Sequence, residues 1–321
     1  MIRSNFSAMF PPTPLKIGFF GLPLAALLLE RDGHRVEWAV LSPLELPGRR
    51  RITQSLAAQR RLVDLLLDDA SWQTEVSRLI AEHPVDLIVS WFFTRRILEP
   101  WISAAPAGAI GVHPSLLPRF RGPDPFFAVI DGGETETGVT VHRLSAEYDK
   151  GEILAQRTLA IGERNAWQLA RALDRPSLAS LREVVAAFAM GSPPRGKDQN
   201  EELVSWAPSP SGASLRVDWR WPTERVLRRI RALSPVPGVL IELNQVRFIL
   251  IEARPTGDYP STLEPGEAYL HERVVLRTGT GAIAVEKAFL DQEDEEPKPI
   301  SGARLVDLLR SQEKSPGSGE F

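Results

Sequence analysis

Short apolar runs alternate with helix-forming segments in the first part of the chain. Leu15–Gly21 is an apolar run closed by a glycine, which is typical of a buried parallel strand. Helix formers fill Leu22–Arg31, where Pro23 falls in the first turn and is tolerated. Arg35–Leu41 alternates between polar and apolar residues and predicts a second strand. Together these segments predict a βαβ unit.

The same alternation continues to about residue 190. A polar, basic stretch at Pro47–Arg61 is followed by an amphipathic region that predicts helix through about Glu82. Ala166–Met190 predicts a long helix with a break or kink near Pro176. Further strands are predicted at Val85–Trp91, Ala109–Val112, Thr137–Leu144 and Glu152–Ile161. Strands that alternate with helices predict an α/β fold built on a doubly wound, mostly parallel sheet.

The pattern changes after residue 190. Residues 191–200, GSPPRGKDQN, have the composition of a linker. Short strands follow, such as Val246–Glu252 and Glu272–Leu276, and are interrupted by proline and glycine, which predicts a smaller β-rich domain. We therefore expect a first domain at residues 1–190, a linker at 191–206, a second domain at 207–313 and a flexible tail at 314–321.

Composition excludes several kinds of chemistry. The 321 residues hold 38 Lys and Arg against 41 Asp and Glu, a net charge of −3, which argues against indiscriminate nucleic-acid coating but leaves a local basic patch open. The sequence has no cysteine, so disulfides, thiolate nucleophiles and Cys-ligated metals are excluded, and a reducing cytoplasm fits. No apolar run approaches the ~20 residues of a membrane span. The histidine spacings predict no metal site.

A histidine and an aspartate follow predicted strands. GVHPSLLPRFRG, residues 111–122, leaves one strand, and Pro114 and Pro118 restrict the backbone around His113. Asp149 lies in a tight loop between two later strands. Because ligands sit at the carboxyl ends of parallel strands, His113 and Asp149 are candidates for a proton-transfer pair within contact or one bridging water. A structural loop with a hydrogen-bonded histidine is the alternative.

These segments resemble a known family. GVHPSLLPRFRGPDP, GGETETGVTVHRL and DKGEIL are similar to the catalytic half of the 10-formyltetrahydrofolate-dependent formyltransferases, which act on methionyl-tRNA, nucleotide amino sugars or glycinamide ribonucleotide. APSPSGASLRVDW, VLRRIRALSPVPG and SGARLVDLL resemble the C-terminal domain of the methionyl-tRNA enzymes, a small barrel. The resemblance runs from about Leu15 to Leu309. It implies a formyltransferase fold, a β-barrel-like (OB-like) second domain and 10-formyltetrahydrofolate as formyl donor.

The resemblance also implies an active site and marks one departure. The family has an Asn-x-His pair and a later Asp; by position the histidine is His113 and the aspartate Asp149, while Gly111 stands where the asparagine would be. An amine would attack the formyl carbon, with His113 binding the oxyanion or moving a proton and Asp149 orienting His113. Loss of one oxyanion donor typically costs on the order of 10²–10³ in rate. Gly111 therefore leaves open a non-catalytic binding protein of this fold.

The resemblance implies where the formyl donor and the acceptor bind. The folate would lie between residues 91–97, the His113 loop and the loop before Asp149, next to Trp91, Phe92, Ser115, Leu116, Leu117, Pro118 and Glu147. Residues 91–97, WFFTRRI, are bulkier and more basic than the family's usual glycine-containing stretch, and their aromatic side chains also fit core packing.

Arginines are the candidate contacts to the acceptor. Arg49, Arg50, Arg51, Arg60 and Arg61 fall where the methionyl-tRNA enzymes have a basic loop that enters the acceptor stem, and Arg119 and Arg121 could steer an acidic ligand. The helix at Thr223–Arg231 adds Arg225, Arg228, Arg229 and Arg231. We expect a methionyl-tRNA-type acceptor, with a nucleotide amino sugar or another small amine as the alternative. The other histidines, His34, His83, His142 and His271, are expected to be structural.

Overall fold

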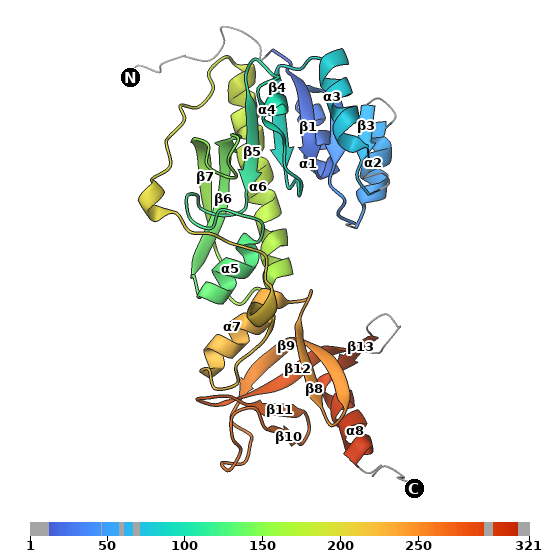
Figure 1. The fold of residues 1–321 in the computed structure, drawn as a ribbon, viewed down its shortest axis with the longest axis vertical. Helices are drawn as coiled ribbons and strands as arrows, with labels where there is room; N and C mark the ends of the chain where they lie inside the picture. The colour runs from blue at the N-terminus through green and yellow to red at the C-terminus, as the bar shows by residue number, and fades with distance from the viewer. Residues whose placement is uncertain (1–12, 46, 58–60, 67–70, 292–297, 314–321) are drawn as a thin grey trace, which may run out of the picture. The chain divides into compact units, whose positions relative to one another are not determined.

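The computed structural model describes residues 13–45, 47–57, 61–66, 71–291 and 298–313. These residues form two compact units, which Figure 1 draws with their elements labelled. One unit is drawn from Met1–Pro123, Thr137–Leu159 and Leu173–Trp206, and the other from Asp124–Glu136, Ala160–Ala172 and Ala207–Phe321. The predicted tail at 314–321 and Arg60 lie outside the described residues. Within the described ranges, no helix is both long and apolar enough to cross a membrane.

The first unit is built on a seven-stranded sheet in the order β3-β2-β1-β4-β5-β6-β7. Neighbouring strands from β3 to β5 pair in parallel, and β6 pairs antiparallel with β5. The strands are β1 Lys16–Gly21, β2 Arg35–Leu41, β3 Arg61–Asp64, β4 Leu87–Trp91, β5 Ala109–His113, β6 Glu136–Arg143 and β7 Ile153–Ala160. The helices are α1 Pro23–Arg31, α2 Arg49–Ala57, α3 Trp72–Glu82, α4 Glu99–Ile102 and α6 Ala166–Ala189, of which α6 contributes to both units. The predicted mostly parallel α/β sheet is confirmed.

Two elements differ from the sequence-based expectation. The region predicted as helix up to Glu82 contains strand β3, because Val63 is buried in the core and β3 pairs with β2. Helix α6, predicted with a break or kink near Pro176, is a single continuous element, so the break is absent. Next to the proline, the Ser177 hydroxyl donates to the Asp174 carbonyl (2.8 Å) and is itself the acceptor for the Trp91 indole N–H (2.9 Å). These bonds tie this turn of the helix to the sheet.

The described part of the second unit contains a six-stranded sheet, helices α5, α7 and α8, and the first residues of α6. The strand order is β10-β11-β12-β9-β8, with β13 also on β12, and the pairs are antiparallel. The elements are α5 Pro125–Gly132, α7 Thr223–Leu233, β8 Val239–Leu243, β9 Val246–Thr256, β10 Ala268–Leu270, β11 Val274–Arg277, β12 Ala282–Leu290, β13 Lys298–Ser301 and α8 Gly302–Glu313. Its core is formed by side chains such as Val226, Ile230, Phe248, Leu250, Leu305 and Leu309. The predicted small β-rich domain is confirmed, and its antiparallel sheet is curled into a half-barrel.

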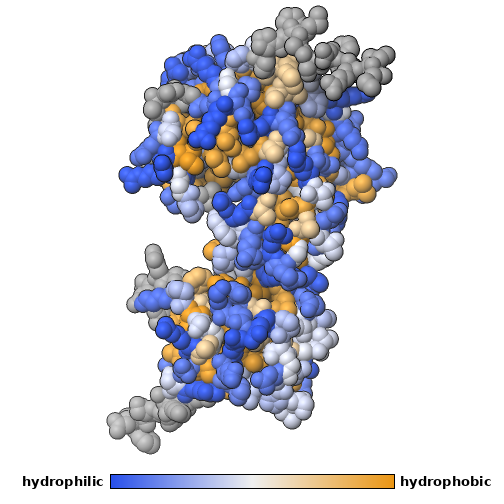
Figure 2. All heavy atoms as spheres, turned by 180° about the vertical axis from the view of Figure 1, so that it is seen from behind, coloured by the Kyte–Doolittle hydropathy of each residue, from blue (hydrophilic) through white to orange (hydrophobic). Residues whose placement is uncertain are grey.

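The described residues include several exposed large hydrophobic side chains. Hydrophilic residues cover most of the face shown in Figure 2, and hydrophobic residues appear in smaller areas between them. Among large side chains, Val236, Trp206 and Met190 are the most exposed hydrophobic ones, at 82%, 62% and 62%. Apolar residues exposed singly are normal for a globular protein, so we assign no function to them.

Candidate active site

The site begins with the register between β5 and β6. In this antiparallel pair Gly111 lies opposite His142, and His113 lies opposite Thr140. Because side chains two residues apart point to the same face of a strand, these four positions share one face of the sheet. The structure therefore places His142 beside the two positions that the family resemblance singled out.

His113 and Asp149 lie together. His113 Nδ1 is 3.5 Å from Asp149 Oδ1, and His113 Nε2 is 2.7 Å from the Phe120 carbonyl oxygen. Asp149 sits in a turn at φ +56, and its Oδ2 accepts a hydrogen bond from the Gly122 N–H (2.9 Å). The His113 side chain is 7% exposed and that of Asp149 17%, so the carboxylate remains within reach of solvent. A separation of 3.5 Å is a loose contact that a bound substrate or water can tighten.

His142, which we expected to be only structural, belongs to the same cluster. Its Nε2 is 3.8 Å from Asp149 Oδ1, and its Nδ1 is 2.9 Å from the Arg143 carbonyl oxygen. Burial lowers the pKa of His142 to about 4, although the Asp149 charge acts in the opposite direction. His142 is therefore neutral at physiological pH. The pairing of the two predicted strands in register was the signal that would have identified it.

Gly111 is covered by a leucine. A Cβ atom built on Gly111 would lie 2.6 Å from Leu144 Cδ2 and 3.7 Å from His142 Nε2. The first distance is a clash with the far end of a flexible side chain, while the second is ordinary contact. An asparagine at this position would thus meet the Leu144 side chain first and the His142 ring next to it.

The loop after His113 is held by side-chain hydrogen bonds. The Thr140 hydroxyl donates to the Ser115 carbonyl (2.7 Å) and accepts from the Leu117 N–H (3.1 Å). Gln156 Nε2 donates to the Leu117 carbonyl (2.9 Å), and the buried Ser115 hydroxyl donates to the Arg119 carbonyl (2.7 Å). These bonds fix the backbone of the loop, and Leu116 and Pro118 are its half-buried side chains.

The other residues expected near the folate lie in different environments. Trp91 is 2% exposed and its indole donates to Ser177, so it is part of the core. Phe92 is half-buried, at φ +52, with its ring 4.7 Å from that of Trp91. Glu147 is exposed and paired with Lys150. The core packing that we gave as the alternative thus describes Trp91.

Residues 197–206, which we call the strap, lie against both loops of the site, although they were predicted to be linker. Gln199 Nε2 donates to the Asp149 carbonyl (2.6 Å) and the Gly151 carbonyl (2.8 Å). The Ser205 hydroxyl accepts from the Phe120 N–H (2.9 Å), and the Ser205 carbonyl accepts from the Arg121 N–H (2.9 Å). The strap therefore holds the Asp149 turn and the end of the His113 loop.

Two of the arginines expected to bind substrate are used internally. Arg49 is 5% exposed and pairs with Asp64 through two hydrogen bonds. Arg121 is 2% exposed and is bound by Gln199 and Glu201. We correct both to structural roles, because a buried guanidinium requires a partner of opposite charge. Arg50, Arg51 and Arg119 are exposed.

The arginines of α7 are also largely engaged within the second unit. Arg225 and Arg229 both bind Asp131 of α5, and Arg231 binds Glu163. Arg229 in addition donates to the carbonyls of residues 214 and 216. The expectation that this helix offers its arginines to phosphates is therefore not supported by its contacts.

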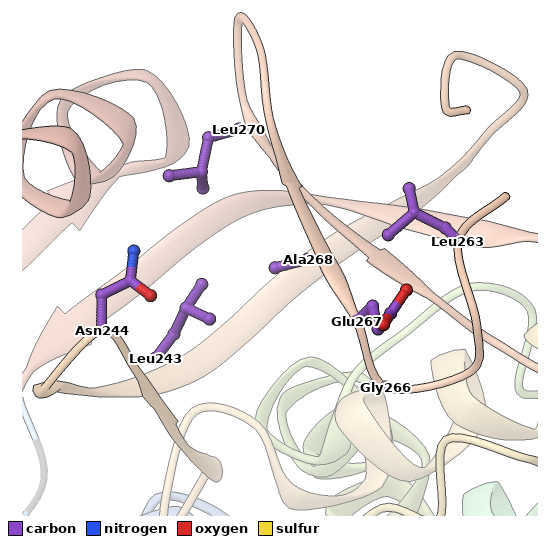
Figure 3. Close-up of a pocket in the computed structure, with 7 residues that line it drawn as sticks. All are labelled: Leu243, Asn244, Leu263, Gly266, Glu267, Ala268 and Leu270. Atoms are coloured by element: carbon purple, nitrogen blue, oxygen red, sulfur yellow. The ribbon is translucent and has the colours of Figure 1, made fainter. Parts of the chain in front are cut away.

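The second unit contains a pocket of its own. It has a volume of about 420 Å³, and Figure 3 shows its lining of Leu243, Asn244, Leu263, Gly266, Glu267, Ala268 and Leu270. Asn244 and Glu267 are its polar side chains, and no histidine joins them, so proton-transfer chemistry is better supported at Asp149. Among the described residues, no group of three or more His, Asp or Glu side chains has the arrangement of a metal site.

Comparison with known proteins agrees with this picture. The chain matches the family "Formyl transferase" over residues 45–175 and "Formyl transferase, C-terminal domain" over residues 212–298. The methionyl-tRNA formyltransferase of Anaeromyxobacter dehalogenans is 31% identical over 79% of this chain and 84% of its own length. That of Variovorax paradoxus is 28% identical over 95% of this chain and 98% of its own.

Solved structures share the fold. HypX from Aquifex aeolicus in complex with tetrahydrofolic acid has a TM-score of 0.67 and 22% identity over 92% of this chain, which spans about half (48%) of HypX. An N-formyltransferase from Helicobacter canadensis, in complex with folinic acid and dTDP-3-aminofucose, has a TM-score of 0.62 and 13% identity over 84% of this chain and 99% of its own. The two family matches together with the 31% identical relative show that this chain belongs to the formyltransferase family.

Proposed function

We propose that this protein transfers the formyl group of 10-formyltetrahydrofolate to a primary amine, and that the acceptor is a methionyl-tRNA-type aminoacyl group. The observation that carries the proposal is the His113–Asp149 pair, which sits at 3.5 Å on anchored loops within a formyltransferase fold. Relatives of about 30% identity over most of the chain are methionyl-tRNA formyltransferases, which supports this acceptor.

The residues present fit a folate donor. When bound, the donor supplies an activated formyl group on its N10 nitrogen. In our proposal the fixed backbone of residues 115–118, with Leu116 and Pro118, contacts the folate, and Phe92 closes its edge. Asp149, with its partly exposed carboxylate, takes the proton of the attacking amine. His113 binds Asp149 through Nδ1 and is oriented by the Phe120 carbonyl.

The basic surface that we assign to the acceptor is smaller than the sequence suggested. Arg50 and Arg51 are exposed on α2, and Arg119 is exposed in the His113 loop. A phosphate contact by an arginine releases condensed counterions, which makes binding dependent on salt. We propose that Arg50 and Arg51 contact the acceptor backbone.

The test is a formylation assay with two acceptors, methionyl-tRNA and a dTDP-amino sugar. We expect formyl-methionyl-tRNA with the wild type and none with His113→Ala or Asp149→Asn. Replacing Arg50 and Arg51 by alanine should reduce the salt slope of tRNA binding by about 2, roughly one per contact. Arg220→Ala is the matched control, since Arg220 is exposed and pairs locally with Asp218. An unchanged slope in the double variant would remove the tRNA contact from the proposal.

A small amine such as a nucleotide amino sugar is the second candidate acceptor. It is favoured by the internal pairing of Arg225, Arg229 and Arg231, which leaves less basic surface for a nucleic acid. Transfer to the amino sugar but not to methionyl-tRNA would select it. Binding of a folate analogue in calorimetry without transfer to either acceptor would select the non-catalytic alternative that Gly111 raises.

A further inference from the structure

Both imidazoles of the site are fixed through the nitrogen that faces away from Asp149. His113 Nε2 is 2.7 Å from the Phe120 carbonyl oxygen, and His142 Nδ1 is 2.9 Å from the Arg143 carbonyl oxygen. A carbonyl oxygen only accepts, so both of these nitrogens carry a hydrogen. A neutral imidazole has one hydrogen in total. The nitrogens that remain, His113 Nδ1 and His142 Nε2, then present lone pairs.

These two nitrogens face the same carboxylate oxygen. Asp149 Oδ1 lies 3.5 Å from His113 Nδ1 and 3.8 Å from His142 Nε2. Because Asp149 Oδ1 also carries lone pairs, a proton placed between it and either nitrogen would form a hydrogen bond. His142 Nε2 is thus positioned to accept a proton that reaches Asp149 Oδ1.

The protonation state of His142 follows from its surroundings. The charged or titratable groups that face its ring are Asp149, His113 and Arg121. Burial, and to a smaller extent the charges of His113 and Arg121, lower the pKa of His142 to about 4. His142 Nε2 is therefore without a proton at physiological pH, and its lone pair faces Asp149 Oδ1.

We propose that His142 is the terminal proton acceptor of a His113–Asp149–His142 relay, and that this relay serves the reaction where Gly111 supplies no side chain. The inference rests on the proposed function. A side chain at Gly111 would reach His142 Nε2, since its Cβ would lie 3.7 Å from that atom. Because residue 111 is a glycine, the polar side-chain atom next to it is His142 Nε2. The Leu144 side chain covers Gly111.

The proton balance closes within the cluster. As the acceptor nitrogen bonds to the formyl carbon, Asp149 Oδ1 takes the N–H proton of that nitrogen. His142 Nε2 accepts the resulting O–H hydrogen bond, takes the proton from Oδ1 and gives it back to Oδ1 before the donor leaves. Asp149 then returns the proton to N10 of the donor as the bond between the formyl carbon and N10 breaks, with its electron pair staying on N10. The cluster ends with the same number of protons with which it began.

The first test reads the protonation state of His142 directly. In ¹⁵N-histidine-labelled protein at pH 7 we expect His142 to carry its hydrogen on Nδ1, with a bare Nε2 that becomes protonated only near pH 4. Asp149→Asn should shift the Nε2 resonance and leave the Nδ1 resonance in place. An Nε2–H tautomer, or a charged His142 at pH 7, would overturn the relay.

The second test separates proton acceptance from hydrogen bonding. His142→Leu should lower kcat by about 10²-fold, in the range of general acid–base catalysis, and leave KM unchanged. His142→Gln retains an accepting oxygen but cannot take a proton, so it should be equally slow. His83→Gln, a histidine outside the cluster, is the matched control.

Each kinetic outcome decides one question. Rescue by His142→Gln, or full activity of His142→Leu, would overturn the relay and leave the proposed function standing. A wild type that formylates neither acceptor would instead overturn the proposed function, whatever the tautomer of His142.

Discussion

At the scale of residues, the absence of a side chain at Gly111 determines which polar groups lie at this site. Gly111 lies opposite His142 in the β5–β6 pair, and Leu144 occupies the volume into which a larger residue would extend. The asparagine expected at this position is a hydrogen-bond donor, whereas neutral His142 offers a lone pair. With glycine at position 111, the site therefore has a hydrogen-bond acceptor where the family has a donor. An asparagine placed at this position would also need the volume that Leu144 occupies.

Gly111→Asn should destabilise the protein by about 1–3 kcal/mol, the usual cost of overpacking, because its Cβ clashes with Leu144 Cδ2. The double variant Gly111→Asn/Leu144→Ala removes that clash and should recover most of the loss. Urea unfolding measures both, with Leu144→Ala alone as the control. If the losses in unfolding free energy of the two single variants add up to the loss of the double variant, Leu144 does not restrict the size of residue 111.

The stability of the protein should depend on pH through His142. Its folded-state pKa of about 4 lies below the ordinary value of 6.5, so the unfolded chain binds this proton at higher pH than the native chain. Above about pH 6.5 this group therefore leaves the free energy of unfolding at its full value. The free energy of unfolding decreases as the pH falls toward 4, by about 3 kcal/mol in total. Urea unfolding between pH 4 and 7.5 should show a shallower dependence in His142→Leu. Equal slopes would contradict the lowered pKa.

At the scale of elements, the strap formed by residues 197–206 acts on the site without entering the chemistry. Its Gln199 binds two backbone carbonyls of the Asp149 turn, and its Ser205 binds the end of the His113 loop. Residues 191–200, which overlap the start of the strap, are rich in proline, glycine and charge, and this composition predicts a linker because it reports local flexibility. It does not report side-chain partners that lie about 50 residues away.

Gln199→Ala should leave two carbonyls of the Asp149 turn unpaired and cost about 1–3 kcal/mol. Because the turn positions Asp149, kcat should fall while donor binding changes little. Glu202→Ala, an exposed residue of the same strap, is the matched control. Calorimetric titration with a folate analogue would measure donor binding, and turnover assays would measure kcat. If Gln199→Ala and Glu202→Ala lose the same amount of kcat, the strap only adds stability.

The pairing of α5 with α7 gives a second prediction for elements. Asp131 is 14% exposed and binds Arg225 and Arg229 together, and these charges hold its pKa below the ordinary value despite burial. Asp131→Asn leaves a buried guanidinium uncompensated and should cost about 3–5 kcal/mol. Glu163→Gln breaks the pair with Arg231 at a 94% exposed carboxylate and should be nearly neutral. Thermal unfolding compares them, and similar losses would refute the role of burial.

For the whole molecule, periodicity and motif spacing predicted most of the architecture. Strand β2 spans Arg35–Leu41 as its alternation indicated, and the motifs placed His113 and Asp149 at adjacent loops. The partners of Arg49 and Arg121 could not be predicted, because nothing local in the sequence distinguishes a surface arginine from one paired with Asp64 or with Glu201, 80 residues away. His142 was missed for the same reason: its significance lies in strand register, which periodicity alone does not supply.

The second unit includes helix α5, which lies far from most of the unit in the sequence. Helix α5 precedes β6 in the chain, yet its Asp131 neutralises two arginines of α7 and its Phe127 packs against the core of the second unit. A fragment beginning at residue 207 would lack both groups. We expect the isolated fragment 207–313 to unfold at a lower temperature than the same unit in the intact chain. We therefore expect that a second domain joined at residue 207 is less stable unless α5 accompanies it.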